Sequence, residues 1–302
     1  MDYKKLIKSR SVRLAILKGL RFVPDRPMIK LQYRIKTGRR LDLKNPRRFT
    51  EKLQWYKLFY KDPAMVQCVD KYDVRAYVQR KGLGHILNEC YGVYDRVEDI
   101  DFQKFPRQFV LKDTLGSGGN SVIVVKDQSA MDLDEVKAQL RKWVGENHRA
   151  KSGGREWPYY SGKKHRILAE RLIAAEAQGG PVEFKFFCFQ GKAEYLYVLA
   201  DRDLGNKASL GIFDKDYHRL PGRRMDEAPL ECNIPKPENF DSMREMAQKL
   251  AEDFPHARID FYNENEQIVF GEITFFDGSG YMKFEPDELD FDMGEKFILQ
   301  GK

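Results

Sequence analysis

Lys112 ends a short apolar run, Phe109-Val-Leu-Lys112, and a glycine-rich segment follows it directly. A buried lysine is costly unless an anion pairs with it, and glycines let backbone N–H groups approach phosphate oxygens closely. The segment offers such groups at Gly116, Ser117, Gly118, Gly119 and Asn120. It is not a Walker A loop, because no Gly-Lys-Ser/Thr follows. Taken alone, the pattern is explained more simply by a hairpin turn after an exposed lysine.

Asp260 and Glu272 stand on either side of a predicted hairpin turn at residues 263–266. If the two strands pair antiparallel, these carboxylates come side by side on one face. Two close carboxylates repel each other unless a cation lies between them, and Mg²⁺ is usually held by one or two carboxylates plus substrate phosphates. Arg258 precedes Asp260 by two residues and therefore shares its face. The apolar residues nearby argue against a solvated hairpin, so we interpret the pair as a metal site.

Two more carboxylates have positions that suit a nucleotide. The run Ile167-Leu-Ala-Glu170 predicts a strand, whose backbone can contact an adenine edge through one N–H and one C=O. Glu183 stands further along the chain, before another predicted strand, where a carboxylate can accept hydrogen bonds from ribose hydroxyls. In isolation neither feature is informative.

The elements that must position these side chains are mostly strands. We predict strands at residues 109–112, 122–125, 167–170, 183–189 and 194–199, and a hairpin that pairs 257–262 with 267–274. We predict helices after Thr50 as N-cap, from Pro63 through Tyr77, from Asp132 with its capping-box partner Glu135, and at residues 243–250. The order strand, glycine loop, strand, helix, strand is not that of a Rossmann unit. The sequence therefore predicts an α+β fold with mostly antiparallel sheets.

Composition places the chain among globular proteins. Its 302 residues are 42% hydrophobic, which is enough for a sizeable core. No window approaches the roughly 18 apolar residues of a membrane-spanning helix, and the N-terminus lacks the apolar core of a signal peptide. The four cysteines form no CxxC pair, which fits a reducing compartment rather than a zinc site or a disulfide scaffold. We therefore expect a cytoplasmic protein.

Basic residues are concentrated at the N-terminus. Residues 1–48 contain 16 Lys or Arg and three acidic residues, whereas the remainder contains 37 basic and 43 acidic ones. Leu14, Ile16, Leu17 and Leu20 add an apolar helical face. Such a segment suits an anionic membrane surface, a polyanionic substrate or nucleic acid, and an arm that packs through its apolar residues is an equal alternative. The absence of a nucleic-acid-binding motif and the acidic remainder argue against nucleic acid.

The order of the chemical features resembles the ATP-grasp superfamily, of which D-alanine–D-alanine ligase is a familiar member. The order runs from the lysine strand and glycine loop to the Glu170 strand and Glu183, and then to Arg258-x-Asp260 and Glu272-x-Thr274. Lys71 fits as well, since such enzymes often carry an early lysine that reaches the nucleotide phosphates. The alternative for Lys71 is an ordinary lysine on a helix surface.

A closer resemblance, to the TupA-like ATP-grasp family, covers most of the chain. The segments that carry it are Asn45-Pro-Arg-Arg-Phe-Thr-Glu-Lys-Leu-Gln-Trp55, Val69-Asp-Lys-Tyr72, Phe109-Val-Leu-Lys112 with its glycine loop, Phe184-Lys-Phe-Phe-Cys-Phe189 with Gly191-Lys192, and Gly271-Glu-Ile-Thr-Phe-Phe-Asp-Gly-Ser-Gly280. The resemblance implies an ATP-grasp fold with ATP between its last two parts. We expect a basic arm at residues 1–45, a helical part at 46–108, a central subdomain with the phosphate loop at 109–172, and a C-terminal subdomain with the metal ligands at 173–302.

The resemblance also implies an activity and roles for the residues. ATP would phosphorylate a carboxylate, and an amine would attack the acyl phosphate, as in carboxylate–amine ligases. Arg258, Lys112 and Lys71 are the implied catalytic residues. The glycine loop, Glu170 and Glu183 would bind ATP, Asp260, Glu272 and Thr274 would hold Mg²⁺, and Gly278, Ser279 and Gly280 would bind the acceptor. Related ligases usually have an asparagine at the position of Thr274. The threonine hydroxyl is a weaker metal ligand than the asparagine, so the number of Mg²⁺ ions, one or two, is left open.

The family is associated with capsule and cell-surface polysaccharide synthesis. It implies an acceptor such as a uronic acid or amino-sugar unit, joined to an amino acid or amine, and residues 1–48 could meet the inner membrane face or a polyanionic glycan. Two alternatives remain: a kinase of the same fold that acts on a sugar or glycan, and a nucleotide-binding protein without catalysis. The intact Lys112, Asp260 and Glu272 argue against the second. The oligomeric state is open.

Overall fold

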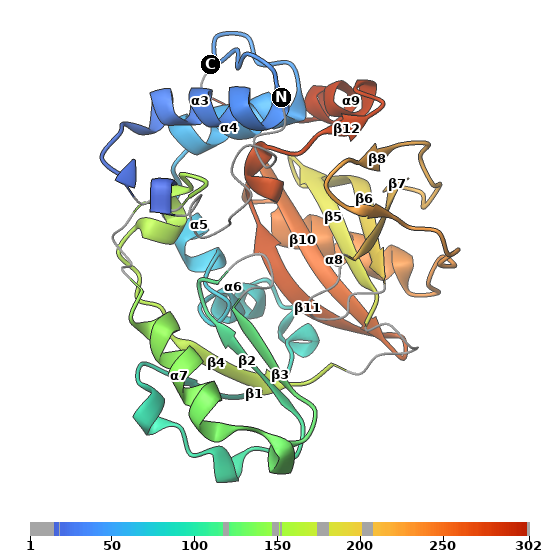
Figure 1. Ribbon diagram of the computed structural model, residues 1–302. Helices are drawn as coiled ribbons and strands as arrows, with labels where there is room; N and C mark the ends of the chain where they lie inside the picture. Colours follow the sequence, from blue (N-terminus) through green and yellow to red (C-terminus); the bar gives the residue numbers. More distant parts are fainter. Residues whose placement is uncertain are drawn as a thin grey trace.

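Two sheets, covered by helices, organise the molecule (Figure 1). The computed structural model describes residues 15–17, 19–116, 121–146, 151, 153–173, 181–200 and 208–300. Among the described strands, every pairing is antiparallel except that of β7 with β9. The prediction of an α+β fold with mostly antiparallel sheets is confirmed.

The small sheet carries the predicted lysine strand. Its order is β1 (Cys90–Tyr94), β4 (Ile167–Arg171), β2 (Phe109–Asp113) and β3 (Val122–Val125). Helix α7 (Leu133–Val144) packs on this sheet through Val136, Leu140 and Trp143. Asp132 caps it as predicted, because its side chain accepts the N–H groups of Asp134 and Glu135. Strand β1 was not predicted, and because of it this sheet begins before residue 109, the predicted start of the central subdomain. The division of the chain into subdomains stays a prediction.

The large sheet carries the predicted metal residues. Its order is β11 (Gln267–Thr274), β10 (His256–Glu264), β5 (Glu183–Phe189), β6 (Lys192–Ala200), β7 (Ser209–Asp214) and β9 (Ala228–Pro229). The predicted hairpin of β10 and β11 is confirmed, with left-handed residues Asn265 and Glu266 in its turn. Because side chains alternate along a strand, this sheet has one apolar face and one polar face.

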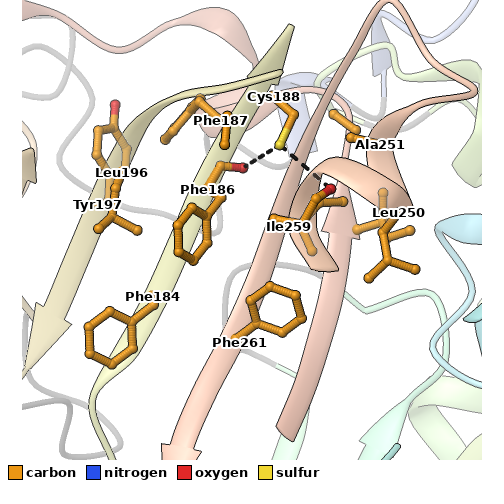
Figure 2. Close-up of a cluster of buried hydrophobic side chains, with 14 of the residues drawn as sticks. Phe184, Phe186, Phe187, Cys188, Leu196, Tyr197, Leu250, Ala251, Ile259 and Phe261 are labelled. Carbon is orange, nitrogen blue, oxygen red and sulfur yellow. Dashed lines mark hydrogen bonds between the residues drawn. The ribbon is translucent and has the colours of Figure 1, made fainter. Parts of the chain in front are cut away.

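The apolar face packs against helix α8 (Phe240–Ala251) (Figure 2). Phe186 and Phe261 meet edge to face with ring centroids 6.0 Å apart. The Cys188 thiol lies 3.7 Å from the carbonyl oxygen of Ala247 in α8 and behaves as a small buried hydrophobe. This packing fixes the strand backbones, and through them the side chains on the opposite, polar face.

Helices of the N-terminal part and the C-terminal helix complete the molecule. They are α3 (Asp25–Thr37), α4 (Phe49–Phe59), α5 (Pro63–Cys68), α6 (Val74–Arg80) and α9 (Glu288–Lys296). Strands β8 (Arg223–Arg224) and β12 (Phe284–Glu285) pair with each other. Short 3-10 helices lie at Gly84–Ile86, Val97–Asp99, Phe102–Lys104, Gln128–Ala130, Trp157–Tyr160 and Asp277–Gly280. Helices α3, α4 and α9 lie together near one end of the large sheet (Figure 1).

Three helix predictions need correction. Thr50 is not an N-cap: it lies inside α4, where its hydroxyl donates to Asp290 of α9 at 2.7 Å. The helix predicted from Pro63 is interrupted between α5 and α6, because the Asp70 side chain accepts the N–H groups of two following residues and forms a turn. No helix was predicted at residues 25–37, because Pro24, Pro27 and Gly38 indicated breaks in the chain. Pro24 and Gly38 instead flank α3 as its caps, and Pro27 falls in its first turn, where a missing N–H is tolerated.

Part of the basic N-terminal segment packs on the body. Arg39 and Arg48 both pair with Asp287, and the exposed part of this segment includes Ile16, which is 44% exposed. Leu14 lies outside the described residues. Among the described residues, no helix combines the length and apolarity needed to cross a bilayer.

Candidate nucleotide and metal site

A cavity of about 370 Å³ lies between the small and the large sheet, and most of the predicted site residues line it. The predicted residues among its lining are Lys71, Lys112, Gly116, Glu170, Glu183, Arg258, Asp260, Glu272, Thr274, Gly278 and Ser279. Gly280 belongs to the same turn as Gly278 but is not part of the lining. Ser117, Gly118, Gly119 and Asn120 lie outside the described residues.

The register of the large sheet aligns four polar side chains in a row across the floor of the cavity. Asp260 of β10 faces Glu272 of β11 on one side and Lys185 of β5 on the other, and Lys185 faces Tyr197 of β6. All four line the cavity. The sequence placed Asp260 beside Glu272, and the register confirms this pairing; the rest of the row was not foreseen.

The Asp260 carboxylate is held by two cations. It accepts hydrogen bonds from Lys185 Nζ at 2.5 Å and from Arg258 Nε and Nη2 at 2.7 Å each. Burial opposes its ionisation, but Arg258 and Lys185 outweigh burial and hold the pKa of Asp260 below its ordinary value. Burial likewise opposes the charge on Lys185, yet Asp260 and Glu183 raise its pKa. These groups are therefore charged before any ligand binds.

Arg258 connects this row with the turn that follows β11. Its Nη1 donates to Asp277, and its Nη2 lies 3.2 Å from the Thr274 hydroxyl and 3.4 Å from Glu272. The Thr274 hydroxyl donates in turn to Glu272 at 3.1 Å. Arg258 is therefore fixed by partners on several sides, as a residue that must present N–H groups to a reacting oxygen requires.

The small sheet contributes Lys112, which reaches across to β4. Its Nζ pairs with Glu170 at 2.8 Å, and Glu170 also lies 3.3 Å from Arg75 of α6. Lys71 comes from the segment between α5 and α6; its Nζ donates to the carbonyl oxygen of Gly116 and lies 3.9 Å from Glu272. Lys71 thus joins the start of the glycine loop to the large sheet.

The turn at Asp277–Gly280 is anchored from helix α4. Lys57 donates to the carbonyl oxygens of Ser279 at 2.7 Å and of Gly154 at 2.8 Å, and Gln54 donates to that of Gly280 at 2.6 Å. Gly280 has a φ of 63°, a left-handed conformation that favours glycine, and a Cβ there would lie 3.0 Å from Cβ of Leu53. Burial lowers the pKa of Lys57 to about 7. The turn is therefore positioned by a buried lysine that no sequence pattern singled out.

The donor set is compatible with Mg²⁺ held jointly with phosphates. Asp260 and Glu272 are neighbours in register, and each keeps one carboxylate oxygen with a lone pair to spare. Asp260 Oδ1 accepts one hydrogen bond, from Arg258 Nε, and Glu272 Oε2 lies 3.9 Å from Lys71 Nζ. Within the described part of the chain, no group of three or more His, Cys, Asp or Glu residues is arranged to hold a metal. Phosphate oxygens would have to complete the coordination, which is the usual way Mg²⁺ binds in nucleotide sites.

Sequence reasoning missed Lys185, Tyr197, Arg224 and Asp277 as parts of the site. Lys185 had a signal, because it follows Glu183 by two residues in a predicted strand and must share its face. Arg224 had none: β8 is two residues long, and its position depends on pairing with β12, far along the chain. Asp277 belonged to the loop predicted to position the acceptor, but its pairing with Arg224 and Arg258 was not predicted.

Comparison with known proteins gives one family match. The model of the family described as TupA-like ATPgrasp matches residues 51–298. No curated protein matches the chain.

Several solved structures resemble the chain. D-alanine–D-alanine ligase from Helicobacter pylori is 17% identical, with a TM-score of 0.45 over 82% of this chain and 68% of that one. The Bacillus anthracis D-alanine–D-alanine ligase is 16% identical, with a TM-score of 0.43 over 76% and 67%. The ATP-grasp ligase PsnB, complexed with a minimal precursor, is 10% identical, with a TM-score of 0.40 over 73% of this chain. The chain spans 56% of the length of PsnB.

Proposed function

The chain belongs to the TupA-like ATP-grasp family, and we propose that it is an ATP-dependent ligase that joins a carboxylate to an amine. One observation carries the proposal: a single cavity receives Lys112 from the small sheet, Lys71 from the helical part, and Arg258, Asp260 and Glu272 from the large sheet. Phosphoryl transfer needs little covalent help from the protein, so positioning and charge neutralisation are the chemistry that such a site can supply.

Each side of the cavity has its own part in this proposal. Lys112 and Lys71 would neutralise the phosphates of ATP, while Glu170 and Glu183 would meet its adenosine part. Asp260 and Glu272, with Thr274, would hold Mg²⁺, which when bound neutralises phosphate charge. Lys112 would exchange Glu170 for a phosphate oxygen, and Glu170 would keep its pairing with Arg75.

The proposed reaction has two steps. In the first, a carboxylate oxygen of the acceptor attacks the γ-phosphorus of ATP, the bond to the β-phosphate oxygen breaks, and ADP leaves. In the second, the amine attacks the carbon of the acyl phosphate, inorganic phosphate leaves, and the amine nitrogen loses a proton. Arg258 would stabilise the transferring phosphoryl group and the oxyanion of the second step.

We further propose that the acceptor is a sugar acid or amino-sugar unit of a cell-surface or capsular polysaccharide. The family resemblance supports this, and Asp277, Gly278 and Ser279 border the cavity where an acceptor would lie. The basic residues before position 49 would meet the glycan or an anionic membrane surface. Those already paired with Asp287, such as Arg39 and Arg48, are less available for such a contact.

The test supplies Mg-ATP, a panel of sugar acids that includes D-glucuronate and D-galacturonate, and hydroxylamine as the amine. A ligase would yield ADP, inorganic phosphate and a hydroxamate in equal amounts, each dependent on the acid. ADP with phosphate retained in the sugar product would identify a kinase instead. Nucleotide binding without release of ADP with any acid would favour a non-catalytic protein. The exposed Lys126→Met variant serves as a control that should match the wild type.

A further inference from the structure

Tyr197 is a buried polar residue on the cavity floor. No sequence pattern singled it out, and the proposed reaction assigns it no role. Its side chain has no exposed surface, it lines the cavity, and its hydroxyl has no hydrogen-bond partner among the described residues. Figure 2 shows the hydroxyl pointing away from the rings of Phe184 and Phe186. Burial, followed by the nearby Asp277, raises the pKa of Tyr197 far above its ordinary value, so the hydroxyl stays protonated.

A buried hydroxyl without a partner is unfavourable in the free protein. Leaving a buried donor unsatisfied forfeits the hydrogen bonds that it made with water. The ring itself is well held, because Phe187 packs edge to face against it at 4.4 Å and Arg224 lies 5.6 Å from its centroid. Since the ring would pack equally well as phenylalanine, the position of the hydroxyl calls for a ligand.

Arg224, which lies beside the Tyr197 ring, shares the carboxylate of Asp277 with Arg258. Asp277 accepts from Arg224 Nη1 at 3.2 Å through one carboxylate oxygen and from Arg258 Nη1 through the other. Arg224 also donates twice to Asp226, through Nε at 3.0 Å and Nη2 at 2.7 Å. A guanidinium group has five N–H donors, so Arg224 keeps further donors beyond these three bonds.

The charges at this end of the cavity are already matched. Arg224, Arg258 and Lys185 are balanced by Asp277, Asp260 and Glu183, and Asp226 adds a further negative charge. A second anion would therefore gain no net attraction and would lose its hydration. A neutral hydroxyl group fits better, because it can donate to Asp277 and accept from Tyr197 or Arg224 at the same time.

We propose that Tyr197, Arg224 and Asp277 form a subsite that binds a hydroxyl group of the acceptor. The acceptor would then be a polyhydroxylated acid, and Tyr197 would be a residue that sets specificity for it. This inference rests on the proposed function, because it takes the cavity to hold the acceptor beside ATP. A site that hydrogen-bonds a substrate hydroxyl rejects analogues that lack it, since its buried polar groups are then left unpaired.

The experiment compares Tyr197→Phe with the wild type in the presence of saturating Mg-ADP. The probes are D-glucuronate and tetrahydropyran-2-carboxylate, which has the same ring and carboxylate without the hydroxyls. We expect Tyr197→Phe to weaken glucuronate binding about tenfold, which corresponds to about 1.4 kcal/mol, and to leave the deoxygenated analogue unaffected. Calorimetry measures both affinities, and the affinity for ADP should not change.

The control is Tyr195→Phe, a half-buried tyrosine on the same strand that is not part of the cavity lining. It should bind both probes like the wild type. Melting temperatures show whether the variants fold, and that of Tyr197→Phe should equal or exceed the wild-type value, because an unsatisfied hydroxyl has been removed.

Any other result would contradict a specific part of the proposal. Equal glucuronate binding by wild type and Tyr197→Phe, or a wild type that does not prefer glucuronate to the analogue, would refute the subsite. A loss of ADP affinity in Tyr197→Phe would assign the hydroxyl to the nucleotide. Binding with the expected discrimination but without release of ADP and phosphate would refute the ligase reaction and leave the subsite standing.

Discussion

The two sheets that enclose the cavity hold their charged side chains in different ways. On the large sheet, the side chains of Lys185 and Arg258 are 7% and 9% exposed, and each contacts at least two carboxylates. On the small sheet, Lys112 is 20% exposed, and the structure pairs it with one carboxylate, Glu170. The large sheet therefore presents a fixed network of charges, whereas the small sheet presents a lysine that can change partner.

This difference follows from what burial requires of a charge. A fully buried charge needs several partners to offset its lost hydration, and those partners also fix its position. A partly exposed lysine can rely on water during an exchange of partners. For a nucleotide site, the large sheet thus supplies preorganised electrostatics, and the small sheet supplies a contact that forms when the phosphate arrives.

The largest expected effect contrasts Lys185→Met with Lys112→Met in stability. Removing Lys185 leaves Asp260 and Glu183 buried with one cationic partner fewer, which should cost about 3–5 kcal/mol. Removing Lys112 should cost about 1 kcal/mol, because Glu170 keeps Arg75 and the lysine is partly solvated. Urea unfolding of both variants at pH 7 measures the free energies. Equal losses would contradict the distinction between the two sheets.

The same pair of variants separates stability from nucleotide binding. Lys112→Met should weaken Mg-ATP binding by about 1.5–3 kcal/mol, since a charge-assisted phosphate contact is lost from a protein that remains folded. Calorimetry measures the affinity, with Lys126→Met as control, because that exposed lysine follows β3 on the same sheet and lies outside the cavity lining. An unchanged affinity would remove Lys112 from the phosphate site.

How much the sequence revealed depended on whether a contact lies within a strand pair or between distant elements. Strand alternation and a hairpin turn predicted that Asp260, Arg258 and Glu272 lie on neighbouring strands, but the register set by the turn would by itself place Gly271 opposite Asp260. A β-bulge between Asp260 and Phe261, which no sequence pattern indicated, shifts the register and brings Glu272 opposite Asp260. The alternation of side chains along a strand would also have placed Lys185 on the same face as Glu183, and therefore in the site. The anchor from Lys57 to Ser279 joins residues 222 positions apart, and no local pattern reports on it.

The helices show the same limit. The cap of α7 was predicted correctly, because Asp132 and its acceptor N–H groups are neighbours in sequence. Thr50 was misassigned, because its partner Asp290 comes from the opposite end of the chain. Tertiary partners override a local preference for capping when the residue is buried, and Thr50 is fully buried.

A third prediction uses pH to test the charge network of the large sheet. Because the pKa of Asp260 is lower in the folded state than the ordinary value of 3.8, its ionised form stabilises the protein above that value. This contribution is lost as the pH falls through the folded-state pKa. The difference in unfolding free energy between wild type and Asp260→Asn should therefore be constant from pH 7 to about 5 and shrink below about 4.

Urea unfolding of the two proteins at pH 7, 5, 4 and 3 measures this difference. The exposed Asp95→Asn variant is the control and should follow the wild type throughout. A difference that grew on acidification would mean that the network destabilises ionised Asp260, contrary to the contacts with Lys185 and Arg258.

The smallest expected effect on stability is that of Glu272→Gln, and it separates the two carboxylates of the large sheet. Two adjacent carboxylates would repel each other if they were alone, but here Lys185 and Arg258 already neutralise Asp260. Glu272 is 40% exposed and its contacts with Arg258 and Lys71 are long, 3.4 and 3.9 Å. Its replacement should therefore change the free energy of unfolding by about 0–1 kcal/mol.

The Mg²⁺ concentration for half-maximal ATP binding should nevertheless rise by at least about tenfold in Glu272→Gln, because even residues that contact metal ligands without binding the metal have effects of that size. Calorimetric ATP titrations at several Mg²⁺ concentrations measure this, and an unchanged requirement would place the metal away from Glu272.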